Sequence, residues 1–216
     1  MIKRFIMLGA PGVGKGTQAN KLADDFEWKH ISTGDMLREA MRKDNPVGRQ
    51  VKGYVDRGDL VPDDLMIQLV MNRLEEDDCR HGFLLDGFPR TVLQAKKLDT
   101  FLHDSGHDLD GVISIEIPNE EIVKRLSQRL VCKDCGHMMK GNDSPAKEMV
   151  CPLCKGIVTK RIDDEPDTIR HRLKVYEERT QSLIEYYQSK NLYIRIDGMD
   201  SIDGVYRRII HALGIS

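Results

Sequence analysis

Short apolar segments alternate along the chain with longer stretches that have helical periodicity. The apolar, β-branched segments are the expected strands, at Phe5–Leu8, His30–Ser32, Phe83–Asp86, Gly111–Ile117 and Leu192–Asp197. Strands that alternate with helices form a parallel sheet covered by those helices. The pattern therefore predicts an α/β fold built on a five-stranded parallel sheet.

Proline and capping residues mark several of the expected helix boundaries. Pro62 and two aspartates open a helix that we expect to reach Glu76. Pro166 stands near the start of a long helix that we expect to reach Ser189, and Ser201 is expected to cap the last helix.

Two stretches do not fit a simple alternation of strands and helices. The first is short, charged and broken by Arg57-Gly58-Asp59, which predicts a small helical insertion. The second has too few apolar residues for a core of its own but contains four cysteines. We expect a core formed by residues 1–31, 62–128 and 166–216, with insertions at 32–61 and 129–165.

A glycine-rich loop, GAPGVGKGT at residues 9–17, follows the first expected strand and precedes a helix-like stretch. Such a loop turns backbone N–H groups and the positive end of a helix dipole toward one point, which favours a di- or triphosphate. Lys15 would bridge the β- and γ-phosphates. The usual pattern has a hydroxyl directly after the lysine, whereas here Gly16 intervenes before Thr17. The alternative interpretation is an ordinary glycine-rich turn.

The overall charge does not indicate nucleic acid as the main partner. Lysine and arginine total 33 and aspartate and glutamate total 35, so no global basic field exists. The apolar run at the start is too short for a signal peptide, and no stretch approaches the roughly 20 apolar residues of a membrane span. We expect a cytoplasmic protein that does not contact a membrane.

Four of the five cysteines form two C-x2-C motifs, Cys132-Lys-Asp-Cys135 and Cys151-Pro-Leu-Cys154. The spacing of the two motifs fits a tetrahedral zinc site, whereas disulfides would not persist in a reducing cytosol. We expect zinc or a similar thiophilic metal. His137 could replace one ligand, although four cysteines already complete the shell. The remaining Cys79 is expected to be a structural thiol.

Charged side chains stand at the ends of expected strands, where open α/β folds bind ligands. Asp86 occupies the position of the acid that holds Mg²⁺ through water in P-loop enzymes, and the alternative is a turn-capping aspartate. Guanidinium groups suit phosphate oxygens, and phosphoryl transfer needs a cluster of them, although a single arginine is more often a solvated surface charge. The arginines with suitable neighbours are Arg38, Arg90, Arg129, Arg161 and Arg172.

Taken together, these motifs resemble the adenylate kinase family, in its bacterial, long-lid, metal-binding form. The likeness covers essentially the whole chain and is carried by residues 9–18, 32–38, 58–61, 86–90, Gln94, the four cysteines and residues 196–198. It implies the reaction ATP + AMP ⇌ 2 ADP with Mg²⁺ in a monomer. Residues 32–61 would be the AMP-binding insertion, and residues 129–165 a mobile lid with a structural zinc.

The resemblance also implies roles for individual residues. Gln94 has a donor and an acceptor for the N1 and N6 edge of adenine, unless it is an exposed helical glutamine. Asp163 and Asp164 would assist Mg²⁺ water placement or lid closure. The residues that would assist phosphoryl transfer are Lys15, Arg90, Arg129, Arg161 and Arg172. The ATP contacts implied are Gly12, Val13, Gly14, Lys15, Gly16, Thr17 and Arg129. The AMP contacts implied are Thr33, Arg38, Asp59, Leu60, Val61, Gly87, Phe88, Pro89, Arg90, Gln94, Arg161 and Arg172.

Two positions depart from the family pattern. Gln128 stands where a glycine often precedes the lid arginine, and Met138-Met139 stand where an aromatic residue commonly lies near adenine. One alternative is a nucleoside monophosphate kinase for UMP or CMP, but such relatives have a short lid without metal knuckles. Another is a P-loop protein whose zinc ribbon binds nucleic acid, but residues 129–165 lack the aromatic residues that stacking requires.

Overall fold

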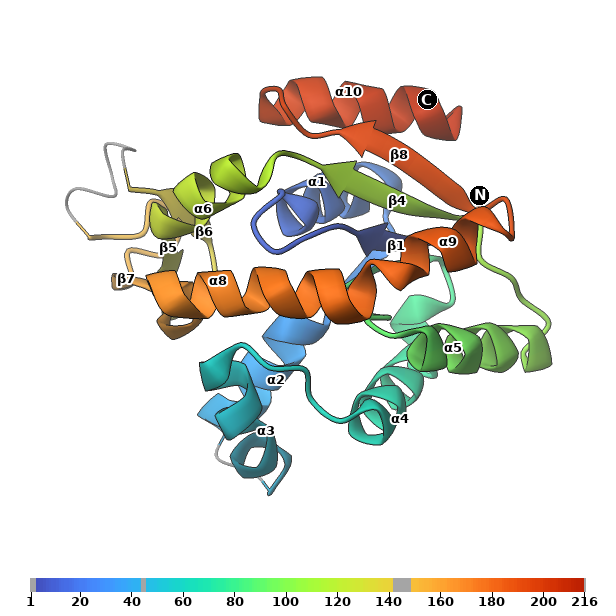
Figure 1. Ribbon diagram of the computed structural model, residues 1–216, viewed down its shortest axis with the longest axis horizontal. Coiled ribbons are helices and arrows are strands. Elements are labelled where there is room, and N and C mark those ends of the chain that lie inside the picture. The colour runs from blue at the N-terminus through green and yellow to red at the C-terminus, as the bar shows by residue number, and fades with distance from the viewer. Residues whose placement is uncertain (1–2, 44–45, 142–148, 216) are drawn as a thin grey trace.

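A five-stranded parallel sheet forms the centre of the protein in the computed structural model, which describes residues 3–43, 46–141 and 149–215 (Figure 1). The strand order is β2-β3-β1-β4-β8, and every neighbouring pair is parallel. The predicted α/β fold is therefore confirmed. The strands are β1 (Arg4–Leu8), β2 (Lys29–Ser32), β3 (Phe83–Asp86), β4 (Gly111–Glu116) and β8 (Tyr193–Asp197).

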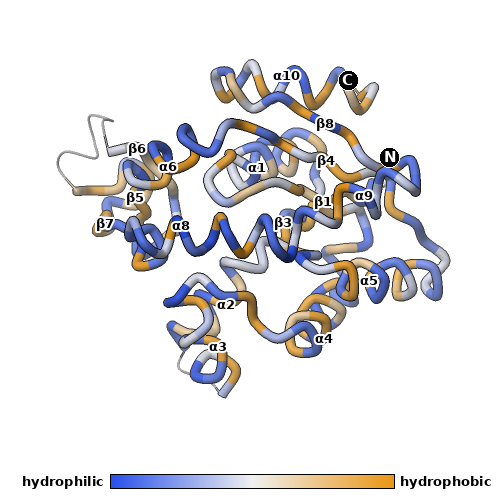
Figure 2. The backbone as a smooth tube through the Cα atoms, viewed as in Figure 1, coloured by the Kyte–Doolittle hydropathy of each residue, from blue (hydrophilic) through white to orange (hydrophobic). Residues whose placement is uncertain are grey.

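Each face of the sheet is buried under its own set of helices. Successive side chains of a strand point to opposite faces, so Phe5 and Met7 join one core cluster while Ile6 and Leu8 join the other. Figure 2 shows polar and apolar residues mixed along the covering helices, as expected for helices with one buried face. The first cluster is covered by α1 (Lys15–Phe26), α6 (Asn119–Ser127), α8 (Pro166–Val175) and α10 (Ile202–Leu213), and the second by α4 (Asp63–Leu74), α5 (Val92–Asp104) and α9 (Ser182–Gln188).

The single long helix expected from Pro166 to Ser189 is interrupted. A π-helical turn, Tyr176–Thr180, separates α8 from α9. Residues of α8 pack into the first core cluster, whereas Leu183 and Tyr187 of α9 pack into the second. A wider turn rotates the apolar stripe around the helix axis, so one continuous segment can serve both clusters.

Two short helices follow β2 in the chain, α2 (Thr33–Arg42) and α3 (Pro46–Arg57). Ser32 caps α2, because its Oγ accepts from the Asp35 N–H at 3.3 Å. Ser201 caps α10 as expected, accepting from the Gly204 N–H at 3.0 Å. No helix in the described ranges is long and apolar enough to cross a membrane.

A separate antiparallel ribbon, with strand order β6-β5-β7, contains the cysteine motifs. Its strands are β5 (Arg129–Cys132), β6 (Met138–Lys140) and β7 (Val158–Lys160). Its small core joins Leu130, Met139 and Val158 to the thiols of Cys132 and Cys151. The ribbon lies beside α8 and away from β8 (Figure 1).

Candidate active site

A cleft of about 1090 Å³ lies at the carboxyl edge of the central sheet, between the sheet, α2, α3 and the ribbon. Open α/β folds bind ligands at this edge. Nearly all the nucleotide-site residues expected from the sequence line this cleft, although they come from segments far apart in the chain. The exception is Phe88, whose side chain is buried in the core beneath the cleft.

The glycine-rich loop has a backbone that larger residues would not tolerate. Gly9, Gly12 and Gly14 have φ angles of +131°, +85° and +107°. A Cβ on Gly9 would lie 2.4 Å from the Ile115 carbonyl oxygen. No side chain caps the first turn of α1, so its N–H groups face the loop. This is the geometry of an anion site at a helix N-terminus.

Lys15 folds back over the loop. Its Nζ donates to the carbonyl oxygens of Gly9 and Ala10 at 2.8 and 2.9 Å. Burial lowers the pKa of Lys15 to about 8, with Asp86 opposing this shift and Arg90 adding to it. A phosphate at the loop would supply the negative partner that this ammonium lacks among the surrounding carbonyls.

Asp86 ends β3 directly opposite the loop. Its Oδ2 lies 3.3 Å from the place where a Cβ on Gly16 would stand, so Gly16 leaves room for the carboxylate. Burial opposes ionisation of Asp86, but His30 and Lys15 outweigh it and hold the pKa of the carboxyl below its usual value. The carboxylate is therefore charged and faces the phosphate loop.

His30 is a neighbour of Asp86 that the sequence analysis treated only as a strand residue. Its Nδ1 lies 2.6 Å from the Asn20 Oδ1, and its Nε2 lies 3.7 Å from the Asp86 Oδ2. No sequence motif marked His30, because its position beside Asp86 follows from the pairing of β2 with β3.

Two aspartates neutralise the arginines at the base of the ribbon. Arg129 forms two hydrogen bonds with Asp164, of 2.7 and 2.5 Å, and Arg161 forms two with Asp163, of 2.9 and 2.6 Å. Arg172 lies between them, 3.0 Å from an Asp163 oxygen and 3.2 Å from an Asp164 oxygen. Burial lowers the pKa of Arg172 to about 10, although Asp163 opposes the shift.

Two further arginines face these from the other side of the cleft. Arg38 pairs with Asp35 at 2.6 Å, and Arg90 donates from Nε to the Gly87 carbonyl oxygen at 2.8 Å. Burial lowers the pKa of Arg90, and the charge of Arg38 adds to this effect while Asp86 opposes it. The cationic side chains thus converge on one volume, where a phosphate chain would relieve their repulsion.

Gln94 is buried at the cleft wall, with only 2% of its surface exposed, so it is not a solvated helical glutamine. Its Oε1 accepts from the Arg90 N–H at 2.7 Å, and its Nε2 donates to the Asp63 Oδ1 at 2.7 Å. Asp63 is one of the two aspartates after Pro62 that mark a helix start in the sequence, and no local pattern links it to Gln94.

Arg125 is a further lining residue that the sequence analysis missed. Its guanidinium donates to the carbonyl oxygens of Val13 and Gly198, at 3.4 and 3.3 Å, and to Glu121 at 3.1 Å. These bonds hold the group between the glycine-rich loop and the segment after β8. Its helical setting carried no motif from which this position could have been predicted.

The ribbon closes the cleft on one side. The Met138 methyl lies 3.5 Å from the position of a Cβ on Gly16, while Met139 is buried in the ribbon core. Arg42 of α2 donates to the Lys133 carbonyl oxygen of the ribbon at 3.2 Å. Gln128 has a φ of −98°, so the backbone before Arg129 does not require a glycine.

The four cysteines of the ribbon converge, with all four sulfurs within 4.8 Å of one another. The Sγ–Sγ separations are 3.4 Å for Cys132 and Cys154 and 3.6 Å for Cys135 and Cys151. His137 is not among the converging ligand atoms, and its backbone carbonyl oxygen accepts from the Cys132 N–H. The four thiols can therefore hold one metal ion.

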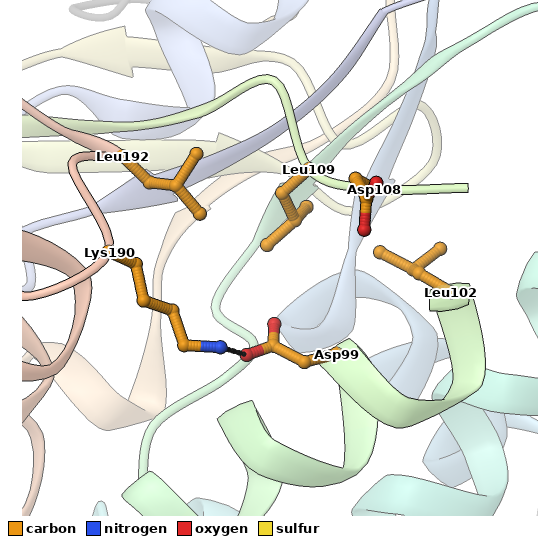
Figure 3. Close-up of a pocket in the computed structure, with 6 residues that line it drawn as sticks. All are labelled: Asp99, Leu102, Asp108, Leu109, Lys190 and Leu192. Atoms are coloured by element: carbon orange, nitrogen blue, oxygen red, sulfur yellow. Dashed lines mark hydrogen bonds and ion pairs between the residues drawn. The ribbon is translucent and has the colours of Figure 1, made fainter. Parts of the chain in front are cut away.

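A second, smaller cavity of about 230 Å³ lies between α5 and the segment that leads into β8 (Figure 3). Lys190 forms an ion pair with Asp99 across it at 2.5 Å, and Asp99 also accepts from the Tyr186 hydroxyl at 2.7 Å. Lys190 and Asp99 are thus engaged with each other, and none of the lining residues belongs to the predicted site.

Comparisons with known proteins agree with this geometry. The sequence profile described as adenylate kinase matches residues 7–192. Adenylate kinases from Caldicellulosiruptor saccharolyticus and Thermoanaerobacter sp. are 46% and 47% identical to this chain, over 98% of it and 99% and 98% of their own lengths. The adenylate kinase of Methanocella arvoryzae is 48% identical over 94% of both chains. The chain belongs to the adenylate kinase family of phosphotransferases, which transfer a phosphoryl group between ATP and AMP.

Proposed function

We propose that this chain catalyses the reversible, Mg²⁺-dependent transfer of the γ-phosphoryl group of ATP to AMP, giving two ADP. The observation that carries the proposal is the single cleft in which the glycine-rich loop, the arginines and Gln94 meet. Transfer would be direct and in line, because the cleft supplies positioning and positive charge for a transition state whose charge spreads over the phosphoryl oxygens.

The donor half of the proposed site is the glycine-rich loop. N–H groups of residues 12–17 would bind the ATP phosphates, with Lys15 at the β- and γ-phosphates and Arg129 at the side of the ribbon. Mg²⁺ bound with ATP would neutralise phosphate charge, and Asp86 would hold it through water. Arg125 would lie against the adenine of ATP, since a guanidinium plane stacks on aromatic rings.

The acceptor half lies between α2, α3 and the Gly87–Arg90 turn. Arg38 and Arg90 would bind the AMP phosphate, together with Arg161 and Arg172, while Thr33 and Gln94 would contact the base. The remaining proposed contacts are Asp59, Leu60, Val61, Gly87 and Pro89. With the ribbon placed over the phosphates, water would be excluded and hydrolysis would not compete.

We further propose that the ribbon metal is a structural zinc. Zinc–sulfur bonds of about 2.3 Å in a tetrahedron place the sulfurs about 3.8 Å apart, close to the separations of the thiol pairs. Four thiolates leave no open position for catalysis. A reducing compartment such as the cytoplasm suits four thiolates. The proposal includes a monomer with a core, an AMP-binding insertion at 32–61 and a mobile lid at 129–165.

The experiment that tests the proposal measures ADP formation by the purified protein with MgATP and AMP, UMP, CMP, GMP or no acceptor. We expect turnover with AMP only. Turnover with UMP or CMP would favour a pyrimidine nucleotide kinase, and ATP loss without any acceptor would contradict the exclusion of water.

A further inference from the structure

We propose that Asp63 determines acceptor specificity by fixing the orientation of the Gln94 side-chain amide. In the fixed orientation the amide pairs with a 6-aminopurine and opposes a 6-oxopurine. The inference rests on the proposed function, in which Gln94 contacts the base of the acceptor nucleotide. Asp63 itself does not line the cleft, so its role is that of a positioning residue behind Gln94.

Asp63 stands on the first turn of α4 and accepts two hydrogen bonds from α5. Its Oδ1 accepts from the Gln94 Nε2 at 2.7 Å, and its Oδ2 accepts from the Thr91 hydroxyl at 3.0 Å. Thr91 also accepts from the Gln94 N–H at 3.2 Å, as the cap of α5. The hydroxyl proton of Thr91 is therefore committed to Asp63, and both oxygens of Asp63 act as acceptors.

The two anchors of the Gln94 amide cannot exchange roles. On one side a carboxylate only accepts, and on the other the Arg90 N–H only donates, to the Gln94 Oε1 at 2.7 Å. A flipped amide would place its carbonyl against the Asp63 carboxylate and its NH₂ against the Arg90 N–H. The two partners therefore determine which end of the Gln94 amide is oxygen and which is nitrogen.

The anchored amide keeps one N–H and one oxygen lone pair for a ligand. Gln94 is 2% exposed and lines the cleft, so in the proposed function these two groups would face the base. Adenine has an acceptor at N1 and a donor at its 6-amino group. The N–H of Gln94 can therefore donate to N1, and its oxygen can accept from the 6-amino group. A 6-oxopurine such as hypoxanthine has a donor at N1 and an acceptor at O6. Against this edge the fixed amide would place its N–H beside the N1–H and its oxygen beside O6, so that donor meets donor and acceptor meets acceptor.

Rejection of the wrong base depends on the amide being unable to turn. Sites that hydrogen-bond a substrate discriminate strongly, because a mismatched base leaves buried polar groups unpaired. If Asp63 were replaced by a group that both donates and accepts, Gln94 could turn to suit either base. Turning would still set the Gln94 NH₂ against the Arg90 N–H, but the second mismatch, at position 63, would be gone, so a 6-oxopurine nucleotide would become a better acceptor relative to AMP.

The test compares kcat/KM for AMP and IMP, with saturating MgATP, in the wild type and in Asp63→Asn. We expect the AMP-to-IMP ratio to fall about tenfold or more in Asp63→Asn, because the side-chain amide of asparagine can pair with either orientation of Gln94. The matched control is Asp64→Asn, the exposed neighbour on the same helical turn, whose ratio should stay within about twofold of the wild type. A structural defect would lower both rates together and leave the ratio unchanged.

Asp63→Ser gives a second variant, because a hydroxyl also both donates and accepts, and thermal melts establish that each variant is folded. Affinities for AMP and IMP measured by calorimetry without ATP give a readout independent of turnover. An unchanged ratio in both variants, with a wild type that uses AMP and rejects IMP, would overturn the role of Asp63 and leave the proposed function standing. A wild type that does not use AMP would overturn both.

Discussion

Arg129 and Asp164 form a bidentate salt bridge across the base of the ribbon, with Nε–Oδ2 and Nη2–Oδ1 distances of 2.7 and 2.5 Å. The side chains are 17% and 2% exposed, so the carboxylate lies almost entirely out of water. Arg129 begins β5, and Asp164 follows β7. The pair joins both ends of the ribbon and holds Arg129 at the edge of the cleft.

Replacing Asp164 by asparagine should destabilise the protein, because it leaves the partly buried Arg129 without its charged partner. We expect the free energy of unfolding to fall by about 2–4 kcal/mol, as measured by urea denaturation. The control is Asp167→Asn, since Asp167 pairs with Arg170 at the surface with exposures of 96% and 71%. That pair should contribute less than about 1 kcal/mol. Equal effects of the two substitutions would contradict the structural role of Asp164.

Replacing Lys15 by methionine should severely reduce transfer without unfolding the protein. The side chain binds only two loop carbonyls, and its ammonium is the cation proposed for the β- and γ-phosphates. We expect kcat/KM to fall on the order of 10²–10³-fold, the effect of removing one charge-stabilising donor. Lys21→Met on the same helix removes a surface pair with Asp203 and a contact with the Tyr206 ring, but Lys21 does not line the cleft, so this variant should retain activity. Turnover of Lys15→Met at the wild-type level would refute the assigned role.

The lowered pKa of Lys15 predicts that nucleotide binding takes up protons in alkaline solution. Burial lowers the pKa from 10.5 to about 8 in the free protein, and nearby phosphate would raise it again. Above about pH 8, binding should therefore be accompanied by proton uptake and should weaken as the pH rises. Calorimetry of MgATP binding near pH 9, in two buffers of different ionisation enthalpy, measures this uptake. Lys15→Met should abolish it, and uptake that persists in this variant would assign it to another group.

The same shift has an opposite consequence for the stability of the free protein. Because the folded pKa of Lys15 lies below the unfolded value, the charged side chain opposes folding below about pH 8. This unfavourable contribution diminishes as the pH rises from about 8 toward 10.5, since the unfolded chain then binds more protons than the folded one. Relative to Lys15→Met, the free energy of unfolding of the wild type should therefore rise as the pH increases from about 8 and should level off near pH 10.5.

Replacing Cys151 by alanine should lower the bound zinc and the melting temperature more than it lowers turnover below that temperature. Cys151 is fully buried and belongs both to the thiol cluster and to the small ribbon core. Metal binding at such a site contributes folding free energy. Cys79→Ala is the control, because Cys79 contacts Arg73 and lies outside the cluster, so its zinc content should be unchanged. A Cys151→Ala protein with an unchanged melt would show that the metal is not structural.

The strands, the glycine-rich loop and the cysteine motifs could be predicted because each depends on neighbours in the sequence. The apolar segments around Phe5 and Phe83 indicate strands from their own residues alone, and the glycine-rich loop defines the position of Lys15. The π-helical turn at Tyr176–Thr180 could not be predicted in this way. It arises because α8 and α9 pack against different faces of the sheet.

The relationships missed within the site have the same origin. Asp63 meets Gln94 across 31 positions in the chain, and Arg125 meets Gly198 across 73. His30 reaches Asp86 only because β2 pairs with β3. Local patterns identify the type of such residues, but their partners depend on how distant helices and strands pack together.

The most direct test of phosphoryl transfer in this cleft follows the γ-phosphoryl group of ATP. With γ-³²P-labelled MgATP and purified protein, direct transfer should place label in ADP only when AMP is present, with little in inorganic phosphate. Label released mainly as inorganic phosphate, with or without AMP, would contradict direct transfer in this cleft.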